Sequence, residues 1–125
     1  MRNGSQTILA DTKAFGTPFA VTASKDGFAV GCENGDILRV TLDGKLTPIV
    51  NLVNAGFGIP FNLVEVDTKL IVTTNMGNIL QINPDGTIST IVNLSTLGLG
   101  IPSGVAVLDD SYIVTTNAGN LLRIT

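Results

Sequence analysis

A repeat of 42 residues is the feature of this sequence that most restricts its fold. The run Gly16-Thr17-Pro18 recurs as Gly58-Ile59-Pro60 and as Gly100-Ile101-Pro102. In the second and third copies, residues 71–78 and 113–120 agree at seven of eight positions. Other positions keep the same spacing, among them Val30, Val72 and Val114, and Leu38, Leu80 and Leu122. A fixed period of this length indicates similar supersecondary units that stack on one another.

Each copy is predicted to form four short strands rich in Val, Ile, Leu and Thr. We expect those of the second copy near residues 62–67, 70–75, 78–83 and 87–93. Asp43-Gly44 and Asp85-Gly86 are typical of hairpin turns, and Gly77 and Gly119 stand where a three-residue turn needs a left-handed residue. Four strands in about 42 residues, repeated, predict an all-β fold built from β-propeller blades.

Composition argues against several classes of function. Seven Lys and Arg against ten Asp and Glu give a net charge of −3, which disfavours binding to nucleic acid or to an anionic membrane. The chain has no His, the commonest general base and metal ligand. Its single Cys cannot form an internal disulfide or a thiolate zinc site. A mean hydropathy of +0.42, with only short apolar runs, indicates strands covered on both faces.

No targeting or membrane segment is recognisable in the sequence. The first residues lack the continuous apolar stretch of a signal peptide. The longest aliphatic runs are far shorter than the roughly 20 residues that span a bilayer. We therefore expect a soluble protein, cytoplasmic by default.

The third copy resembles the NHL repeat. Residues 100–109 read Gly-Ile-Pro-Ser-Gly-Val-Ala-Val-Leu-Asp, and residues 112–117 and 119–124 read Tyr-Ile-Val-Thr-Thr-Asn and Gly-Asn-Leu-Leu-Arg-Ile. A blade of that family typically carries a Pro-x-Gly-Val-Ala-Val-Asp strand, a Tyr-Val-Ala-Asp-like strand and an Asn-x-Arg-Ile strand. The resemblance is weaker in the second copy, where Gln81 replaces the Arg, and weakest in the first. It implies a six-bladed propeller, a fold whose relatives include interaction domains and, more distantly, lactonase-type and strictosidine-synthase-type enzymes.

The predicted strands do not complete a ring. We assign residues 16–56 to a first blade, 58–98 to a second and 100–125 to a partial third, in which only three strands precede Thr125. Residues 4–12 resemble the missing fourth strand. Known propellers have about four to eight blades, so three cannot close. We expect a single repeat domain, residues 1–125, that forms a two-fold symmetric homodimer of six blades, with residues 4–12 completing a blade of the partner.

Three alternatives to the homodimer stay open. The sequence could be a piece of a longer propeller, a designed or reconstructed repeat protein, or one third of a nine-bladed ring of three chains.

Loops on one face of the expected ring hold the candidate binding residues. They lie on the loops that lead into the innermost strands and on the loops between second and third strands. The set is Phe19, Glu33, Phe61, Asn62, Asn75, Ser103 and Asn117. These side chains could bind a sugar, a peptide or an oxygen-ligated cation such as Ca²⁺. Alternatively, the Asn and Glu side chains bond local backbone in turns, and the Phe side chains pack in the core.

Other polar residues are interpreted as structural. Cys32 aligns with Thr74 and Thr116 and is expected to be a buried thiol. Asp67 and the pair Asp109-Asp110 are expected in turns between first and second strands. No catalytic residue or bound metal is assigned.

Two functions are consistent with these residues. The first is a binding or scaffold module that presents loops on one ring face to a protein, peptide or glycan; a lectin is disfavoured by the lack of Trp and the single Tyr. The alternative is a metal-dependent hydrolase of the lactonase-like type with a site in the axial channel. In those relatives an Asn near a Pro helps to hold the metal, but Asn62 is offset by one residue. The carboxylates would be Glu33 or Glu65, and neither matches the family pattern.

Overall fold

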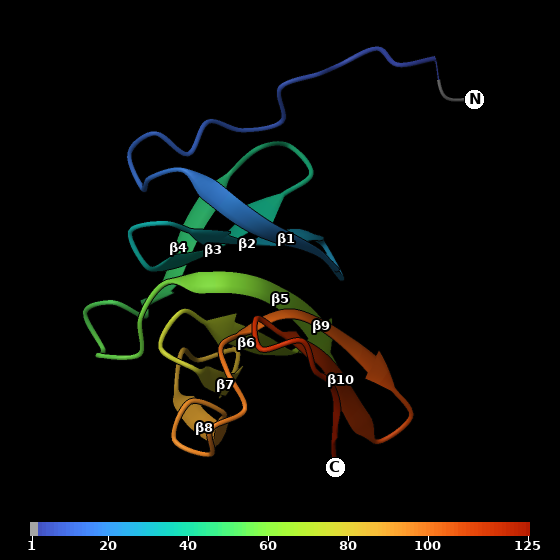
Figure 1. The fold of residues 1–125 in the computed structure, drawn as a ribbon. Coiled ribbons are helices and arrows are strands. Elements are labelled where there is room, and N and C mark those ends of the chain that lie inside the picture. Colours follow the sequence, from blue (N-terminus) through green and yellow to red (C-terminus); the bar gives the residue numbers. More distant parts are fainter. Residues whose placement is uncertain (1–2) are drawn as a thin grey trace.

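The computed structural model describes residues 3–125, so residues 1 and 2 of the predicted domain 1–125 lie outside the described part. Eleven strands and no helix occur within residues 3–125, in three antiparallel sheets (Figure 1). We refer to the sheets as blades 1, 2 and 3. Blade 1 comprises β1 (Pro18–Ser24), β2 (Gly27–Cys32), β3 (Asp36–Thr41) and β4 (Leu46–Asn51). Blade 2 comprises β5 (Pro60–Val66), β6 (Lys69–Thr74), β7 (Asn78–Ile82) and β8 (Ile88–Asn93). Blade 3 comprises β9 (Pro102–Leu108), β10 (Ser111–Thr116) and β11 (Leu121–Ile124).

Each blade is a meander in which strands pair in sequence order. The turns follow the predicted chemistry, because Gly44, Gly77, Gly86 and Gly119 all have φ between 88° and 91°. Asp67 and Thr68 form a two-residue turn with positive φ at both positions, 50° and 71°, as the primed hairpin turns require. The strands predicted for the second copy are shifted by two residues at most, and the largest shift is at Pro60, which opens β5 two residues before the predicted start.

The first strands of the blades lie side by side, β1 next to β5 and β5 next to β9. The blades therefore fan out from a common line, with the fourth strands β4 and β8 farthest from it. Apolar side chains fill the two seams between the blades. The seam between blades 1 and 2 includes Ala29, Ile37, Leu63, Val72 and Leu80. The seam between blades 2 and 3 includes Ile71, Ile79, Val105, Val114 and Leu122.

Blade 3 has three strands in the described chain. Residues 4–12, predicted to be an outer strand of a partner blade, form no strand here and run along the side of blade 1 that faces away from blade 2 (Figure 1). Their pairing with a partner stays a prediction. In the described part of the chain, nothing has the length and apolarity of a membrane-crossing helix.

Candidate functional site

The loops that enter the first strands adjoin the loops between second and third strands in every blade. The Glu33 amide donates to the Thr17 carbonyl at 2.8 Å. In blade 2 the Asn75 amide donates to the Ile59 carbonyl at 3.0 Å, and in blade 3 the corresponding bond, also 3.0 Å, joins Asn117 to Ile101. These paired loops form one face of the molecule, which we term the loop face.

Two of the candidate side chains hold the loop face together. The Asn75 Oδ1 accepts a hydrogen bond from the Ile59 amide at 2.8 Å, and Asn117 Oδ1 accepts one from Ile101 at the same distance. Each Asn therefore joins its loop to the neighbouring one by two bonds, which fits the structural interpretation of these residues. Glu33 occupies the equivalent place in blade 1, but its carboxylate is exposed and has no hydrogen-bond partner within residues 3–125.

The alternative interpretation, that Phe19 and Phe61 pack in the core, is wrong. Both are exposed, at 52% and 39%. The pairing register shifts between Pro18 and Ala20, and again between Pro60 and Asn62, so that each Phe is the extra residue of a β-bulge. A bulge redirects one side chain out of the alternation that would otherwise bury it.

Other apolar side chains on the loops of this face are also exposed. Met76 is 54% exposed, and the connections between blades expose Val53 at 44% and Leu97 at 60%. Ser103 takes the place of the Phe in blade 3, and its hydroxyl lies 3.1 Å from that of Thr115. The loop face therefore combines a fixed backbone with projecting apolar groups.

The residues considered for a metal are not brought together. Asn62 is half-buried on β5, and its Oδ1 accepts a hydrogen bond from the Leu63 amide at 2.8 Å. Glu65 lies near the opposite end of β5, whereas Glu33 lies on the loop face. Among residues 3–125, no three His, Cys, Asp or Glu side chains are grouped so as to bind a metal ion.

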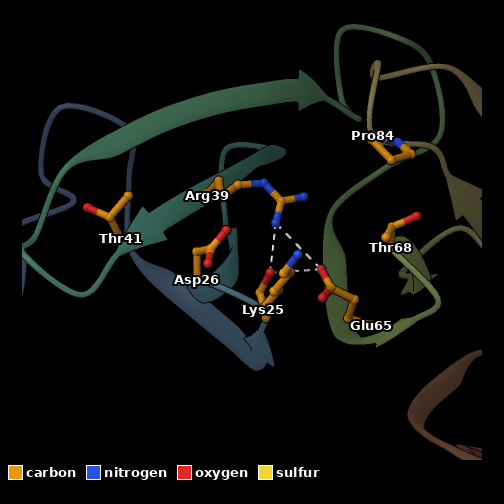
Figure 2. A pocket seen from close by; sticks show the side chains of 8 residues that line it. Lys25, Asp26, Arg39, Thr41, Glu65, Thr68 and Pro84 are labelled. Carbon is orange, nitrogen blue, oxygen red and sulfur yellow. Dashed lines mark hydrogen bonds and ion pairs between the residues drawn. The ribbon is translucent and has the colours of Figure 1, made fainter.

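A pocket of about 340 Å³, lined mostly by polar and charged residues, lies between blades 1 and 2, at the ends of β1 and β5 that are remote from the loop face. Figure 2 shows its lining. The lining residues are Ser24, Lys25, Asp26, Arg39, Thr41, Glu65, Thr68 and Pro84.

Three of these side chains form a network across the seam. Arg39 Nη1 donates to Ser24 Oγ at 2.8 Å, and Ser24 Oγ donates to Glu65 Oε1 at 2.9 Å. Arg39 Nη1 also lies 3.5 Å from Glu65 Oε1 (Figure 2). The Glu65 side chain is only 14% exposed, so these hydrogen bonds replace part of the hydration that its carboxylate would have in water.

Sequence reasoning did not assign Ser24 or Arg39 to a site. A signal existed at Glu65, because the equivalent positions in the other copies hold Ala23 and Val107. A charged residue at a repeat position that is otherwise apolar marks a local specialisation.

Cys32 is buried, as predicted. Burial raises the pKa of its thiol, and the nearby Asp36 carboxylate raises it further. The thiol is therefore protonated and shielded at neutral pH, which fits a structural role.

Comparisons with known proteins give structural similarity alone. No family model matches the sequence, and no curated protein matches it. A streptogramin B lyase structure superposes with a TM-score of 0.65 and 15% identity, over 85% of this chain and 39% of the other. Virginiamycin B lyase from Staphylococcus aureus gives 0.61 and 18%, over 86% and 40%. The computationally designed Ika4 protein gives 0.59 and 11%, over 97% and 100%.

The chain has a β-propeller fold. The three radial antiparallel sheets and the propeller structures that they match agree on this point. The chain spans about two fifths of the length of the two lyases, at 39% and 40%. At these identities the similarity establishes the propeller fold and carries no activity with it.

Proposed function

We propose that this propeller is a binding module of the NHL type that recognises an apolar segment of a protein or peptide through its loop face. The observation that carries the proposal is the projection of Phe19 and Phe61 from equivalent bulges. Exposed aromatic side chains on a fixed backbone lose little conformational entropy on binding and often supply most of the affinity. The resemblance of residues 100–124 to the NHL repeat supports the assignment of the blades to that type.

A peptide or protein fits this face better than a glycan does. Propeller sugar sites usually stack the sugar on Trp or Tyr, whereas Tyr112 is half-buried in the seam between blades 2 and 3 and the chain has no Trp. Exposed apolar groups gathered on one face are typical of protein interaction sites.

A selection with a phage-displayed random peptide library tests the proposal. Ser103 occupies the equivalent position in blade 3, so Phe19→Ser and Phe61→Ser introduce a residue that the blade accepts there. Enriched peptides should contain apolar residues, and the double variant should lose at least tenfold in affinity for them. Leu42→Ser is the control, because Leu42 is 70% exposed but lies in the turn after β3, at the opposite end of blade 1. Peptides that bind the double variant and the native chain equally would refute the proposal.

The proposed role needs no cofactor. A titration with Ca²⁺, followed through the melting temperature, should give no shift relative to EDTA. A Ca²⁺-dependent rise would instead favour the metal-dependent alternative, because a ligand that binds the folded state stabilises it.

A further inference from the structure

The two seams between blades use the same repeat positions. Blade 2 packs against blade 1 through Leu63, Leu70, Val72, Leu80 and Ile82. Blade 3 packs against blade 2 through residues that each lie 42 positions later, namely Val105, Tyr112, Val114, Leu122 and Ile124. The repeat is therefore a repeat of contact surfaces as well as of strands.

Blade 1 carries the same surface but presents it to no blade in the described chain. The equivalent residues are Val21, Phe28, Val30, Leu38 and Val40. Four of them line an apolar groove of about 460 Å³, and residues 7–10 run along its other wall. Val21 is 63% exposed there, whereas Leu63 at the equivalent position is 3% exposed.

Blade 3 exposes the complementary surface. Ile37 and Ile79 are fully buried where blades 1 and 2 receive the next blade, but Leu121 at the equivalent position is 73% exposed. The edge of β11 is also unpaired in the described chain, whereas β3 and β7 each pair with a fourth strand. In the described chain, this surface of blade 3 and the edge of β11 thus lack the neighbours that the equivalent parts of blades 1 and 2 have.

The N-terminal segment already lies where a fourth strand of a preceding blade would lie. The carbonyl oxygen of Leu9 rests against Gly44 in blade 1, and the carbonyl oxygen of Ile49 in β4 rests against Gly86 in blade 2. The two glycines are 42 residues apart, but Leu9 and Ile49 are 40 apart. Leu9 therefore corresponds to Ile49 and, one repeat later, to Ile91. The connection from the N-terminal segment to β1 is two residues shorter than the connections from β4 to β5 and from β8 to β9.

We propose that residues 6–11 are the fourth strand of blade 3 in a second copy of this chain. The register follows from the pairing of β3 with β4 and of β7 with β8, including the shift that both pairs contain. It pairs Gln6 with the partner subunit's Ile124, Thr7 with the partner subunit's Arg123 and Ile8 with the partner subunit's Leu122. After the shift, it pairs Ala10 with the partner subunit's Leu121 and Asp11 with the partner subunit's Asn120.

One polar pair makes this register specific. Asn51 Nδ2 donates to Asp36 Oδ1 at 2.9 Å in blade 1, and Asn93 Nδ2 donates to Asn78 Oδ1 at 2.8 Å in blade 2. Both bonds join the end of the fourth strand to the start of the third. In blade 3 the equivalent residues are Asp11, at the end of the fourth strand, and Asn120 of the partner subunit, at the start of the third. In this pair the third-strand amide donates and the fourth-strand carboxylate accepts, the reverse of blades 1 and 2.

A second copy is the occupant that meets all of these requirements together. The N-terminal segment lies on the side of blade 1 that is far from blade 3, so it cannot pair with blade 3 of its own chain (Figure 1). When two chains of three blades are placed head to tail, residues 6–11 of each chain pair with the β11 edge of the other. The exposed surfaces of blades 1 and 3 are then covered as well, and the product is a two-fold symmetric ring of six blades. The inference concerns assembly alone and stands independently of peptide binding.

Cysteine pairs placed at the two ends of the proposed bond test it directly. Asp36 pairs with Asn51, and Asn78 with Asn93, across the strands, so their Cα atoms lie within the range that a disulfide bridges. Asp11→Cys combined with Asn120→Cys should oxidise to a covalent dimer of twice 13.0 kDa on a non-reducing gel. Cys32→Thr, the residue at positions 74 and 116, removes the native thiol from the background.

Two matched variants control the experiment. Asp36→Cys with Asn51→Cys should form its disulfide within one chain, which shows that the site oxidises. Ser5→Cys with Asn120→Cys is displaced from the proposed register and should remain reduced. Light scattering on the native chain should give the dimer mass.

Several outcomes would overturn the proposal. A native mass of 13.0 kDa would mean that the open edge takes another occupant, such as further residues of a longer polypeptide. If the variant with Asp11→Cys and Asn120→Cys forms its disulfide within one chain, the arc closes on itself. A covalent trimer of that variant would mean a ring of nine blades. Failure of peptide selection would leave each of these readouts unchanged.

Discussion

Arg39 on β3 and Glu65 on β5 form an ion pair of 3.5 Å across the seam between blades 1 and 2, with the Ser24 hydroxyl bonded to both. Because Glu65 is mostly buried, Arg39→Met leaves a carboxylate without its cation. This change should lower the free energy of unfolding by about 1–3 kcal/mol. Glu65→Val should cost less, since the Arg39 side chain is 37% exposed and can be hydrated.

The double variant Arg39→Met with Glu65→Val should be more stable than the sum of the single changes predicts. It removes both charges, and Val107 shows that a valine fits at this repeat position. Urea unfolding of all four proteins at one chain concentration gives the coupling energy. Strict additivity would show that the pair contributes nothing to the seam.

The repeat predicted the blades because strand length, turn residues and spacing are local properties. It could not predict the bulges at Phe19 and Phe61, since the residue that each bulge exposes is itself apolar and reads in the sequence as a core residue. The Arg39–Glu65 pair was missed for a different reason. Its partners lie in different blades, and which repeat positions meet across a seam follows from packing and not from the period.

Gly31 on β2 lies against blade 2. A Cβ at this position would be 3.1 Å from atoms of Pro60 and Leu63. Gly31→Ala should therefore destabilise the chain by about 1–3 kcal/mol through overpacking. In the seam between blades 2 and 3, Thr73 replaces Gly31 and the smaller Val105 replaces Leu63. Adding Leu63→Val to Gly31→Ala should therefore restore part of the lost stability.

Urea unfolding measures both Gly31 variants, with Ala23→Ser as a control on an exposed site of β1. The control should change the free energy of unfolding by less than about 0.5 kcal/mol. If Gly31→Ala behaves like the control, the close approach of the blades is not tight enough to constrain this residue.

Asp85 in the turn after β7 accepts hydrogen bonds from the hydroxyl and the amide of Thr87, at 2.7 Å and 3.0 Å. These bonds, the hydroxyl first, hold the pKa of the carboxyl below its ordinary range. A lowered folded-state pKa stabilises the fold above the unfolded pKa, and this stabilisation is lost as the pH falls through the folded value.

Thr87→Val removes the hydroxyl and keeps the amide. The pKa of Asp85 should rise toward its ordinary range, and the stability difference from the native chain should shrink on acidification. Carboxyl ¹³C NMR measures the titration, with Asp43 as an internal reference, because its pKa is lowered by Thr41 and not by Thr87. An unchanged Asp85 titration would rule out the hydroxyl as the main cause.

Glu33→Asn should add to blade 1 the side-chain bond that the other blades possess. The backbone is already in place, because the Glu33 amide bonds to the Thr17 carbonyl as Asn75 does to Ile59. The shorter Asn side chain should then accept a bond from the Thr17 amide and raise the free energy of unfolding by about 0.5–1.5 kcal/mol. Glu33→Ala is the matched control, since it removes the exposed carboxylate without supplying an acceptor. Amide hydrogen exchange at Thr17 should slow in the Asn variant alone; equal exchange in both variants would mean that the loops of blade 1 are arranged differently from those of blades 2 and 3.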